Sequence, residues 1–356
     1  MKSLQLIEKL SNAPGVSGFE DDVIQTAKEY LDDGFMVEED RLRNLFIKKK
    51  EEENGNRPTV MLDAHSDEVG FMIQSVNRNG TMKFLPVGGW SALSLSAHAV
   101  RVRNTQGEWI KGVVASRPVH FMKKEEAAKM PEISDLVIDI GATSDREVVE
   151  RFQVKTGAPV VPDTAFFRDS ERDLMFGKAF DDRLGCAALL EVMKRFDGTN
   201  SHIRVHGALS SQEEVGVRGV NVSVRKIRPD AAIVLEGTPA DDTVQEKDAV
   251  QAGLRKGPQI RHMDQSVLAS PRFVQMAVDT ARKTGIRIQE AVRSGGGNNG
   301  SVITLHDRGI PTITLGIPVR YIHAHTGIAT MEDFSQTVKW CIEILNHLTE
   351  DIIEGF

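Results

Sequence analysis

Apolar residues recur at helical spacing near the start of the chain. Leu4, Ile7 and Leu10 would share one face of a helix, and the apolar positions from Val23 to Leu31 repeat that spacing. The runs NLFIKKK and TVMLDAH follow, and their short apolar pattern predicts strands. The chain therefore begins as an α/β unit.

The pattern changes between about Val69 and Pro162. Short strand-like runs (KFLPVGGW, AVRVRN, WIKGVVASRPV, LVIDIGA) are separated there by Gly, Asn and Pro, with one charged helical patch, MKKEEAAKM, among them. This texture predicts a small β-rich insert.

After the insert, helical and strand-like patterns alternate. The helical runs are DDRLGCAALLEVMKRF, SPRFVQMAVDTARKTG and MEDFSQTVKWCIEILNHLTEDI, and the strand-like runs are HIRVHGALS, AAIVLEG, IRIQEAV and PTITLGI. Alternation of this kind predicts a mostly parallel sheet with helices on both faces. We therefore expect an α/β fold, a three-layer α/β/α catalytic domain in two parts (1–68 and 165–356) around an insert at 69–164.

Composition and charge exclude several partners. Acidic residues outnumber basic ones by 51 to 44, and KKK at 48–50 is the longest basic run, so nucleic acid is an unsuitable partner. The chain has neither a signal-peptide pattern nor a long uncharged apolar stretch, which predicts a soluble, cytoplasmic protein that does not bind membranes. Cys186 and Cys341 lie in apolar helical patterns, so we expect buried free thiols.

Three predicted strands end in residues that ligate metals. VMLDAHSDE ends in His65 and Asp67, VHGALSSQEE ends in Glu213 and Glu214, and AAIVLEG ends in Glu236. Because ligands bind outside the carboxyl ends of the strands in open α/β sheets, these groups are expected to converge. Taken alone, His65 and Asp67 would be explained equally well as a core histidine beside a solvated acid. An isolated pair of glutamates is more commonly an exposed turn with two solvated acids.

The adjacent glutamates carry the strongest signal. Two carboxylates at the end of a buried strand repel each other and lose solvation unless a cation compensates them. One could then ligate a metal while the other acts as a general base. Asp181, at the start of a helical run, is a further candidate, although an N-cap is the commoner role for such a residue. The remaining imidazole would come from VRYIHAH, where His323 and His325 compete.

Together these residues favour an oxygen-rich site with imidazole and without thiolates. That set suits Zn²⁺ or Co²⁺, and after them Mn²⁺, and two metals sharing a bridging carboxylate would use it fully. The zincin, nucleophile-elbow and Walker A motifs are absent from the sequence. GGGNNG at 295–300 lies too late for a dinucleotide fingerprint and predicts a tight turn or a substrate-side loop.

Five segments, in order and spacing, resemble the tetrahedral (TET-type) aminopeptidases of metallopeptidase family 42, which includes glutamyl and deblocking aminopeptidases. They are LDAHSDEVGFMI, GKAFDDRLG, SSQEEVGVRG, AAIVLEG and VRYIHAH. The resemblance implies that two divalent ions are bridged by Asp181, one completed by His65 and Glu236 and the other by Glu214 and His323. It also implies that Asp67 orients His65 and that Glu213 is the general base.

The same resemblance implies an insert that is a small PDZ-like β-barrel, dimers that assemble into a tetrahedral dodecamer, and short peptides with a free N-terminus as substrates. This chain departs from the family pattern at Glu236, where many relatives carry Asp, and at Asn298 and Asn299, where Thr-Asp is common. After the tyrosine, HAH at 323–325 replaces the more usual HS. Two other functions fit the residues. One is a metal-independent glycoside hydrolase, since some relatives have been labelled cellulases, and the other is a metal-binding scaffold without catalysis.

Overall fold

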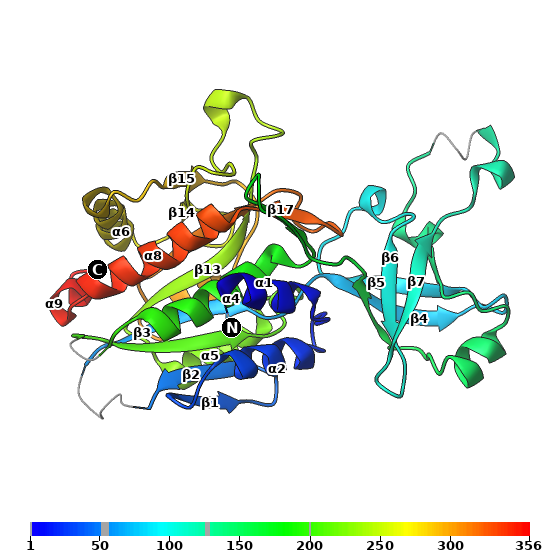
Figure 1. Ribbon diagram of the computed structural model, residues 1–356, viewed down its shortest axis with the longest axis horizontal. Coiled ribbons are helices and arrows are strands. Elements are labelled where there is room, and N and C mark those ends of the chain that lie inside the picture. The colour runs from blue at the N-terminus through cyan, green and yellow to red at the C-terminus, as the bar shows by residue number, and fades with distance from the viewer. Residues whose placement is uncertain (1, 51–56, 125–128, 199–200) are drawn as a thin grey trace.

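The computed structural model describes residues 2–50, 57–124, 129–198 and 201–356. Figure 1 shows a larger α/β body that contains both ends of the chain and a smaller β-barrel body beside it. Residues 125–128 of the predicted helical patch MKKEEAAKM lie outside the described residues.

The larger body is built on an eight-stranded mixed sheet with the order β1-β2-β12-β3-β13-β16-β14-β15. The four central strands β12, β3, β13 and β16 are mutually parallel, while β1, β2 and β14 add antiparallel pairs toward the edges. The strands are β1 (Phe35–Glu39), β2 (Leu45–Lys49), β3 (Thr59–His65), β12 (Arg204–Ser210), β13 (Ala231–Pro239), β14 (Gln259–Met263), β15 (Gln289–Val292) and β16 (Thr312–Val319).

Helices cover both faces of this sheet, as the sequence predicted (Figure 1). Alternate residues of strand β3 point to opposite faces of the sheet and therefore belong to different apolar cores. Leu62 packs with residues of α1, α4 and α8, and Met61 packs with residues of α5 and α7. The helices are α1 (Ser3–Asn12), α2 (Asp21–Tyr30), α4 (Phe180–Arg195), α5 (Arg218–Ile227), α6 (Pro271–Thr284), α7 (Gly300–Thr304), α8 (Met331–His347) and α9 (Glu350–Glu354).

The smaller body is a closed barrel in the order β4-β5-β8-β7-β6-β9, with an apolar core of its own. Its strands are β4 (Gly70–Val76), β5 (Met82–Val87), β6 (Ala99–Arg103), β7 (Trp109–Ala115), β8 (Val137–Asp139) and β9 (Pro159–Pro162). The α/β fold with a barrel insert is therefore confirmed. A small sheet of β10 (Phe167–Asp169), β11 (Leu174–Gly177) and β17 (Gly327–Ala329) completes the strands.

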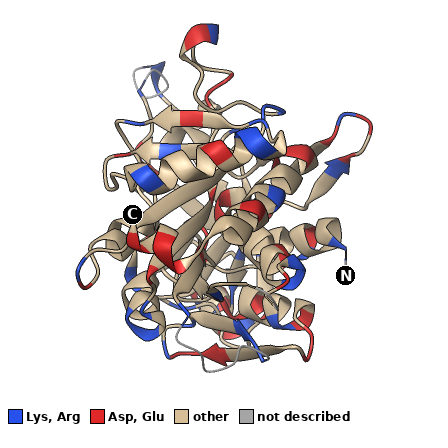
Figure 2. Ribbon diagram, turned by 90° about the vertical axis from the view of Figure 1, so that its left-hand side faces the viewer, with Lys and Arg blue, Asp and Glu red and all other residues tan. Residues whose placement is uncertain are grey.

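Within the described ranges, five short helical turns connect these elements: η1 (Ala92–Ser94), η2 (Val119–Phe121), η3 (Ile133–Asp135), η4 (Glu147–Arg151) and η5 (Lys247–Ala249). Acidic and basic residues alternate along the ribbon in Figure 2, and neither sign forms an extended stripe in this view. Among the described residues, every helix is too short or too polar to cross a membrane.

Candidate active site

The predicted site residues meet at the carboxyl ends of the parallel strands. His65 is the last residue of β3 and pairs in register with Ser210, the last residue of β12. Glu213 and Glu214 follow β12 by three and four positions, and Glu236 lies in the second half of β13. Parallel pairing of β12 with β3 and of β3 with β13 is what brings these distant segments to one place.

Asp181 lies at the centre of the cluster, between two imidazoles. Its Oδ1 is 2.9 Å from His65 Nε2, and its Oδ2 is 3.3 Å from His323 Nε2. His323 Nε2 also lies 3.2 Å from Glu214 Oε1. The two oxygens of one carboxylate thus face two different histidines, each of which has a further carboxylate near it.

Asp182, which sequence reasoning missed, has the capping role considered for Asp181. Residues 181 and 182 have non-helical backbone angles at the start of α4, and Asp182 accepts a hydrogen bond of 2.9 Å from Gly185 N. It also accepts from His65 N (3.1 Å) and Gly237 N (2.8 Å), so it ties β3, α4 and β13 together below the cluster. The doublet DD was visible in the sequence, but nothing there showed which member caps the helix.

Two groups of ligand-type atoms lie within 4.8 Å of one another: His65 with Asp182 and Glu236, and His65 with Asp181 and Glu214. Glu214 Oε1 and Glu236 Oε2 are buried and make no hydrogen bond within the described part of the chain. Buried carboxylate oxygens of this kind are costly unless a cation occupies the space they face.

His325 lies apart from this cluster, whereas the other candidate, His323, belongs to it. Its ring stacks on His98 of the barrel body with centroids 4.0 Å apart, and Trp90 lies 5.2 Å away. The structure brings His323 to the carboxylates and places His325 between the two bodies.

Asp67 connects the cluster to the turn that carries the two glutamates. Its Oδ1 lies 3.3 Å from His65 Nδ1 and accepts a hydrogen bond of 2.9 Å from Glu213 N. Its Oδ2 accepts from Glu214 N (3.1 Å) and from Ser17 Oγ (2.5 Å). One fully buried carboxylate therefore fixes both an imidazole and the backbone of the glutamate pair.

Glu20 is a second residue that sequence reasoning missed. Its Oε1 accepts hydrogen bonds from Gly18 N (2.8 Å) and Gln212 N (3.2 Å), so it supports the same turn from below. Burial, and then the negative charge of Asp67, raise the pKa of Glu20 to about 7. An acid just before a helical run looks like an ordinary helix start, and no local pattern links it to residue 212.

The pKa values describe a cluster with too much buried negative charge. Burial alone would lower the pKa of His323, but the neighbouring carboxylates of Asp181 and Glu214 raise it to about 11. Burial raises the pKa of Glu213 to about 8 and that of Glu236 well above its ordinary value. The cluster therefore stabilises any positive charge placed within it.

A cavity of about 620 Å³ opens beside the cluster, and Asp181, Glu213 and His323 line one side of it. Gly295, Gly296 and Gly297 line it too, so the glycine loop faces the site. Asn298 and Asn299 are buried and donate hydrogen bonds to Asp264 (3.0 Å) and Asp63 (2.6 Å), which anchors that loop to the core.

Two arginines complete the cavity, and each is already paired. Arg261 donates to Asp264 (3.0 Å), and Arg293 donates to Asp241 (2.9 Å). The cavity therefore also carries guanidinium groups whose charge is largely balanced.

The match to known proteins extends over the whole α/β body and its barrel. Residues 43–340 match the family of M42 glutamyl aminopeptidases. The glutamyl aminopeptidase of Lactococcus lactis subsp. cremoris is 29% identical over 357 residues, which cover 99% of each chain. The crystal structure of a TET aminopeptidase from Thaumarchaeota archaeon SCGC AB-539-E09 superposes with a TM-score of 0.94 at 34% identity, covering 100% of this chain and 99% of that one.

A Pyrococcus horikoshii TET1 peptidase, described as able to assemble into a tetrahedron or a large octahedral shell, has a TM-score of 0.86 at 27% identity. The similarity covers 98% of this chain and 100% of that one. Fold and sequence together define an aminopeptidase, a hydrolase that acts on peptide bonds. The chain belongs to the M42 glutamyl aminopeptidase family.

Proposed function

We propose that this protein removes N-terminal residues from short peptides with two divalent metal ions and Glu213 as general base. The arrangement of Asp181 carries the proposal, because its two oxygens face His65 and His323 separately. That is the geometry expected of a carboxylate shared by two cations.

The donor set fits such ions. His65 and Glu236 would hold one ion and Glu214 and His323 the other, with Asp181 common to both. The buried oxygens of Glu214 and Glu236 without hydrogen-bond partners support this assignment. Imidazole and carboxylate without thiolate favour Zn²⁺ or Co²⁺, and after them Mn²⁺. Glu236 is one methylene longer than the Asp of many relatives and can still present an oxygen.

Bound divalent ions would supply the positive charge that acidifies a water molecule and polarises the peptide carbonyl. Glu213 is placed to handle the proton of that water. Its carboxylate lines the cavity and makes no hydrogen bond among the described residues, while its backbone N–H is held by Asp67. Glu213 would take the proton from the attacking water and deliver it to the leaving amine, and Asp67 would keep His65 in a fixed orientation.

Substrate would lie in the cavity between this cluster and the glycine loop. A peptide with a free N-terminus brings a positive charge, which the carboxylates favour. The relative from Lactococcus lactis is named for glutamyl substrates, and Arg261 and Arg293 also line the cavity. We therefore expect acidic first residues to be accepted, although Asp264 and Asp241 reduce the discrimination.

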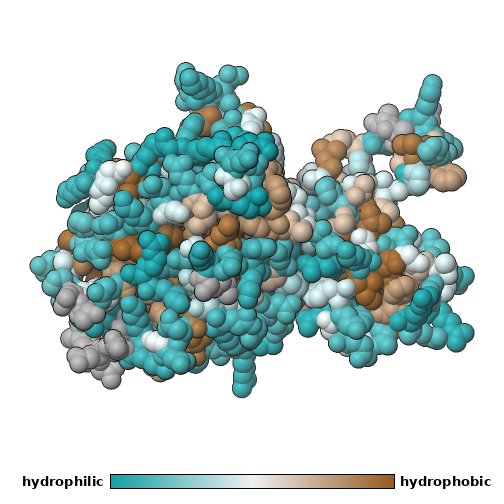
Figure 3. Space-filling view, viewed as in Figure 1, coloured by the Kyte–Doolittle hydropathy of each residue, from teal (hydrophilic) through white to brown (hydrophobic). Residues whose placement is uncertain are grey.

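Self-assembly is part of the proposal. The P. horikoshii TET1 peptidase can assemble into a tetrahedron or a large octahedral shell. In this chain the segment 69–164 carries large apolar side chains that are well exposed, including Leu93 (64%), Val119 (71%) and Phe121 (68%). Figure 3 shows brown patches on this body. Exposed apolar side chains of this kind mark protein–protein contacts, so we propose that 69–164 joins subunits into dimers and then a dodecamer.

The test is hydrolysis of Glu, Asp, Leu, Ala and Lys p-nitroanilides by the purified protein, after EDTA and again after adding Zn²⁺, Co²⁺ or Mn²⁺. The proposal expects activity that disappears with chelation and returns with metal. An N-acetylated version of the best substrate is the matched control, because it lacks the free amine and should not be cleaved.

Two outcomes would contradict the proposal. Hydrolysis of a β-glucan that survives EDTA would indicate a two-carboxylate glycosidase, which needs no metal. Stoichiometric metal binding without hydrolysis of any aminoacyl substrate would indicate a scaffold.

A further inference from the structure

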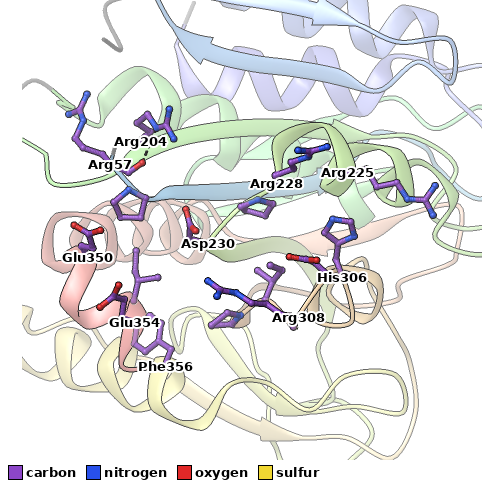
Figure 4. A pocket seen from close by; sticks show the side chains of 17 residues that line it. Arg57, Arg204, Arg225, Arg228, Asp230, His306, Arg308, Glu350, Glu354 and Phe356 are labelled. Atoms are coloured by element: carbon purple, nitrogen blue, oxygen red, sulfur yellow. Dashed lines mark hydrogen bonds between the residues drawn. The ribbon is translucent and has the colours of Figure 1, made fainter. Parts of the chain in front are cut away.

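A larger cavity, of about 1270 Å³, opens at the other end of the sheet, where the parallel strands begin (Figure 4). Its residues precede or begin the parallel strands, among them Pro58 before β3, Arg204 at the start of β12 and Asp230 before β13. Helix α9 contributes Glu350 and Glu354 to one side of it. Because the candidate active site lies at the carboxyl ends of the same strands, the two cavities are separated by the length of the sheet.

The floor of this cavity is held in place by hydrogen bonds between strand ends. Asp230 Oδ2 accepts from Thr59 N (2.7 Å), and Asp230 N donates to Thr59 O (2.8 Å). Arg204 N donates to Pro58 O (2.8 Å). A floor fixed in this way needs no reordering when a ligand binds, which lowers the cost of binding.

Five arginines line the cavity, and three of them have uncommitted guanidinium groups. Arg57 and Arg204 each donate one side-chain hydrogen bond of 3.0 Å to a backbone carbonyl. Arg225, Arg228 and Arg308 make no side-chain hydrogen bond or ion pair with any described residue.

Four carboxylates line the same cavity, those of Asp230, Asp307, Glu350 and Glu354. They leave these three arginines without an ion pair in the described part of the chain. Figure 4 shows Glu350 and Glu354 together at one end, with His306 and Arg225 at the other end. Arg57 and Arg204 lie toward the same end as Glu350, so arginines line both ends of the cavity, whereas the α9 glutamates mark only one of them.

We propose that this cavity binds a small molecule with two or more phosphoryl groups at one end and hydroxyl or amino groups at the other, such as a nucleoside diphosphate. The planar guanidinium binds phosphate through paired hydrogen bonds, and several separate arginines suit several anionic groups. The carboxylates of α9 accept hydrogen bonds from hydroxyl or amino groups. They also repel a long uniform polyanion, which argues against nucleic acid.

The test uses ADP and inorganic pyrophosphate as probes, titrated calorimetrically into the metal-loaded protein. The proposal expects saturable binding of one ADP per chain, with pyrophosphate competing and citrate at equal charge competing poorly. The double variant Arg228→Gln/Arg308→Gln should weaken ADP binding at least tenfold. Neither residue belongs to the active site, so hydrolysis of aminoacyl p-nitroanilides should stay unchanged.

The matched control is Arg41→Gln/Arg78→Gln, which removes the same charge from exposed positions outside the cavity. It should bind ADP within about twofold of the parent chain. A second pair, Arg225→Gln/Arg308→Gln, serves if the first variant fails to fold. Three outcomes would overturn the site. The first is that ADP shows no saturable binding, and the second is that the cavity variant and the control lose equal affinity. The third is full binding by both cavity variants, because ADP would then be held at the metal ions. Displacement by citrate as effective as by pyrophosphate would overturn the phosphoryl assignment.

Discussion

Glu213 and Glu214 are neighbours in the sequence but have different surroundings. The carboxylate of Glu214 lies against His323, whereas that of Glu213 lines the cavity without a hydrogen bond from the described residues. Both backbone N–H groups are held by one residue, Asp67. A single anchored turn thus presents one acid for ligation and another for proton transfer.

Glu213→Gln is expected to lower kcat by about 10²–10⁴-fold, since an amide cannot accept the proton of the attacking water. The side chain is nearly isosteric and is not among the proposed ligands, so two metal ions per chain should still be measured by atomic emission. Glu246→Gln, an exposed change, is the control and should leave kcat unaltered. If Glu213→Gln turns over at the rate of the parent chain, Glu213 is not the base.

Glu20→Gln is expected to stabilise the protein increasingly as pH rises. The folded-state pKa of Glu20 is raised from 4.5 to about 7, so the folded chain retains a proton that the unfolded chain loses above pH 4.5. The stability that the protonated carboxyl contributes is complete below pH 4.5 and is lost as pH rises through 7. Glutamine keeps a neutral group there, and its oxygen can accept both hydrogen bonds that Oε1 accepts now.

The difference in unfolding free energy between Glu20→Gln and the parent should therefore grow between pH 4.5 and 7 and level off above. Its upper limit is about 3 kcal/mol, from the size of the pKa shift. Urea unfolding at pH 5, 6, 7 and 8 would measure it, with the exposed Glu29→Gln as a control that should show a flat difference. A difference independent of pH would contradict the assigned pKa.

At the scale of elements, the sequence predicts the four central parallel strands and the end of these strands at which the acidic residues meet. Buried parallel strands such as β3 and β13 appear as continuous apolar runs, and His65 and Glu236 follow directly from where those runs end. Strand β14 was not predicted, because its run QIRHM contains only two apolar residues, so its antiparallel pairing with β16 was missed as well. The support of the glutamate turn by Glu20 was also hidden, since that contact spans 192 positions.

A buried ionic network fixes α1 to the strands beside the site. Lys178 Nζ lies 2.6 and 2.8 Å from the two oxygens of Glu68 and donates to Ala13 O (3.0 Å) just after α1. Arg183 of α4 donates to Leu10 O (2.7 Å) and lies 3.4 Å from Glu68. All three charged side chains are buried, so each depends on the others.

Lys178→Met is expected to lower the free energy of unfolding by about 3 kcal/mol, because it leaves the buried carboxylate of Glu68 with fewer partners. Lys9→Met is the matched control. Lys9 forms an exposed ion pair of 3.5 Å with Glu29, which should contribute less than about 1 kcal/mol. Denaturant unfolding measures both variants, and adding Glu68→Gln should recover part of the Lys178→Met loss. Similar losses in the two lysine variants would show that the buried network adds nothing.

At the scale of the whole molecule, the proposed ions link elements that are far apart in sequence. Their ligands come from β3, α4, the turn after β12, β13 and the segment after β16. Without cations, these elements bring several carboxylates together in a buried space. Metal binding and folding of the α/β body should therefore be coupled.

Chelation is accordingly expected to lower the thermal unfolding midpoint by several degrees, and Zn²⁺ or Co²⁺ should restore it. An ion at 100 times its dissociation constant stabilises a folded site by about 2.7 kcal/mol. Asp181→Asn should shrink the metal-dependent shift, since it weakens the carboxylate common to both ions. It should not raise the midpoint of the chelated protein, because His65 and His323 lose the carboxylate that both of them contact. Asp248→Asn, at an exposed position, should behave like the parent chain. Calorimetry with and without EDTA distinguishes these cases, and identical midpoints in the parent chain under both conditions would show that no ion holds these elements together.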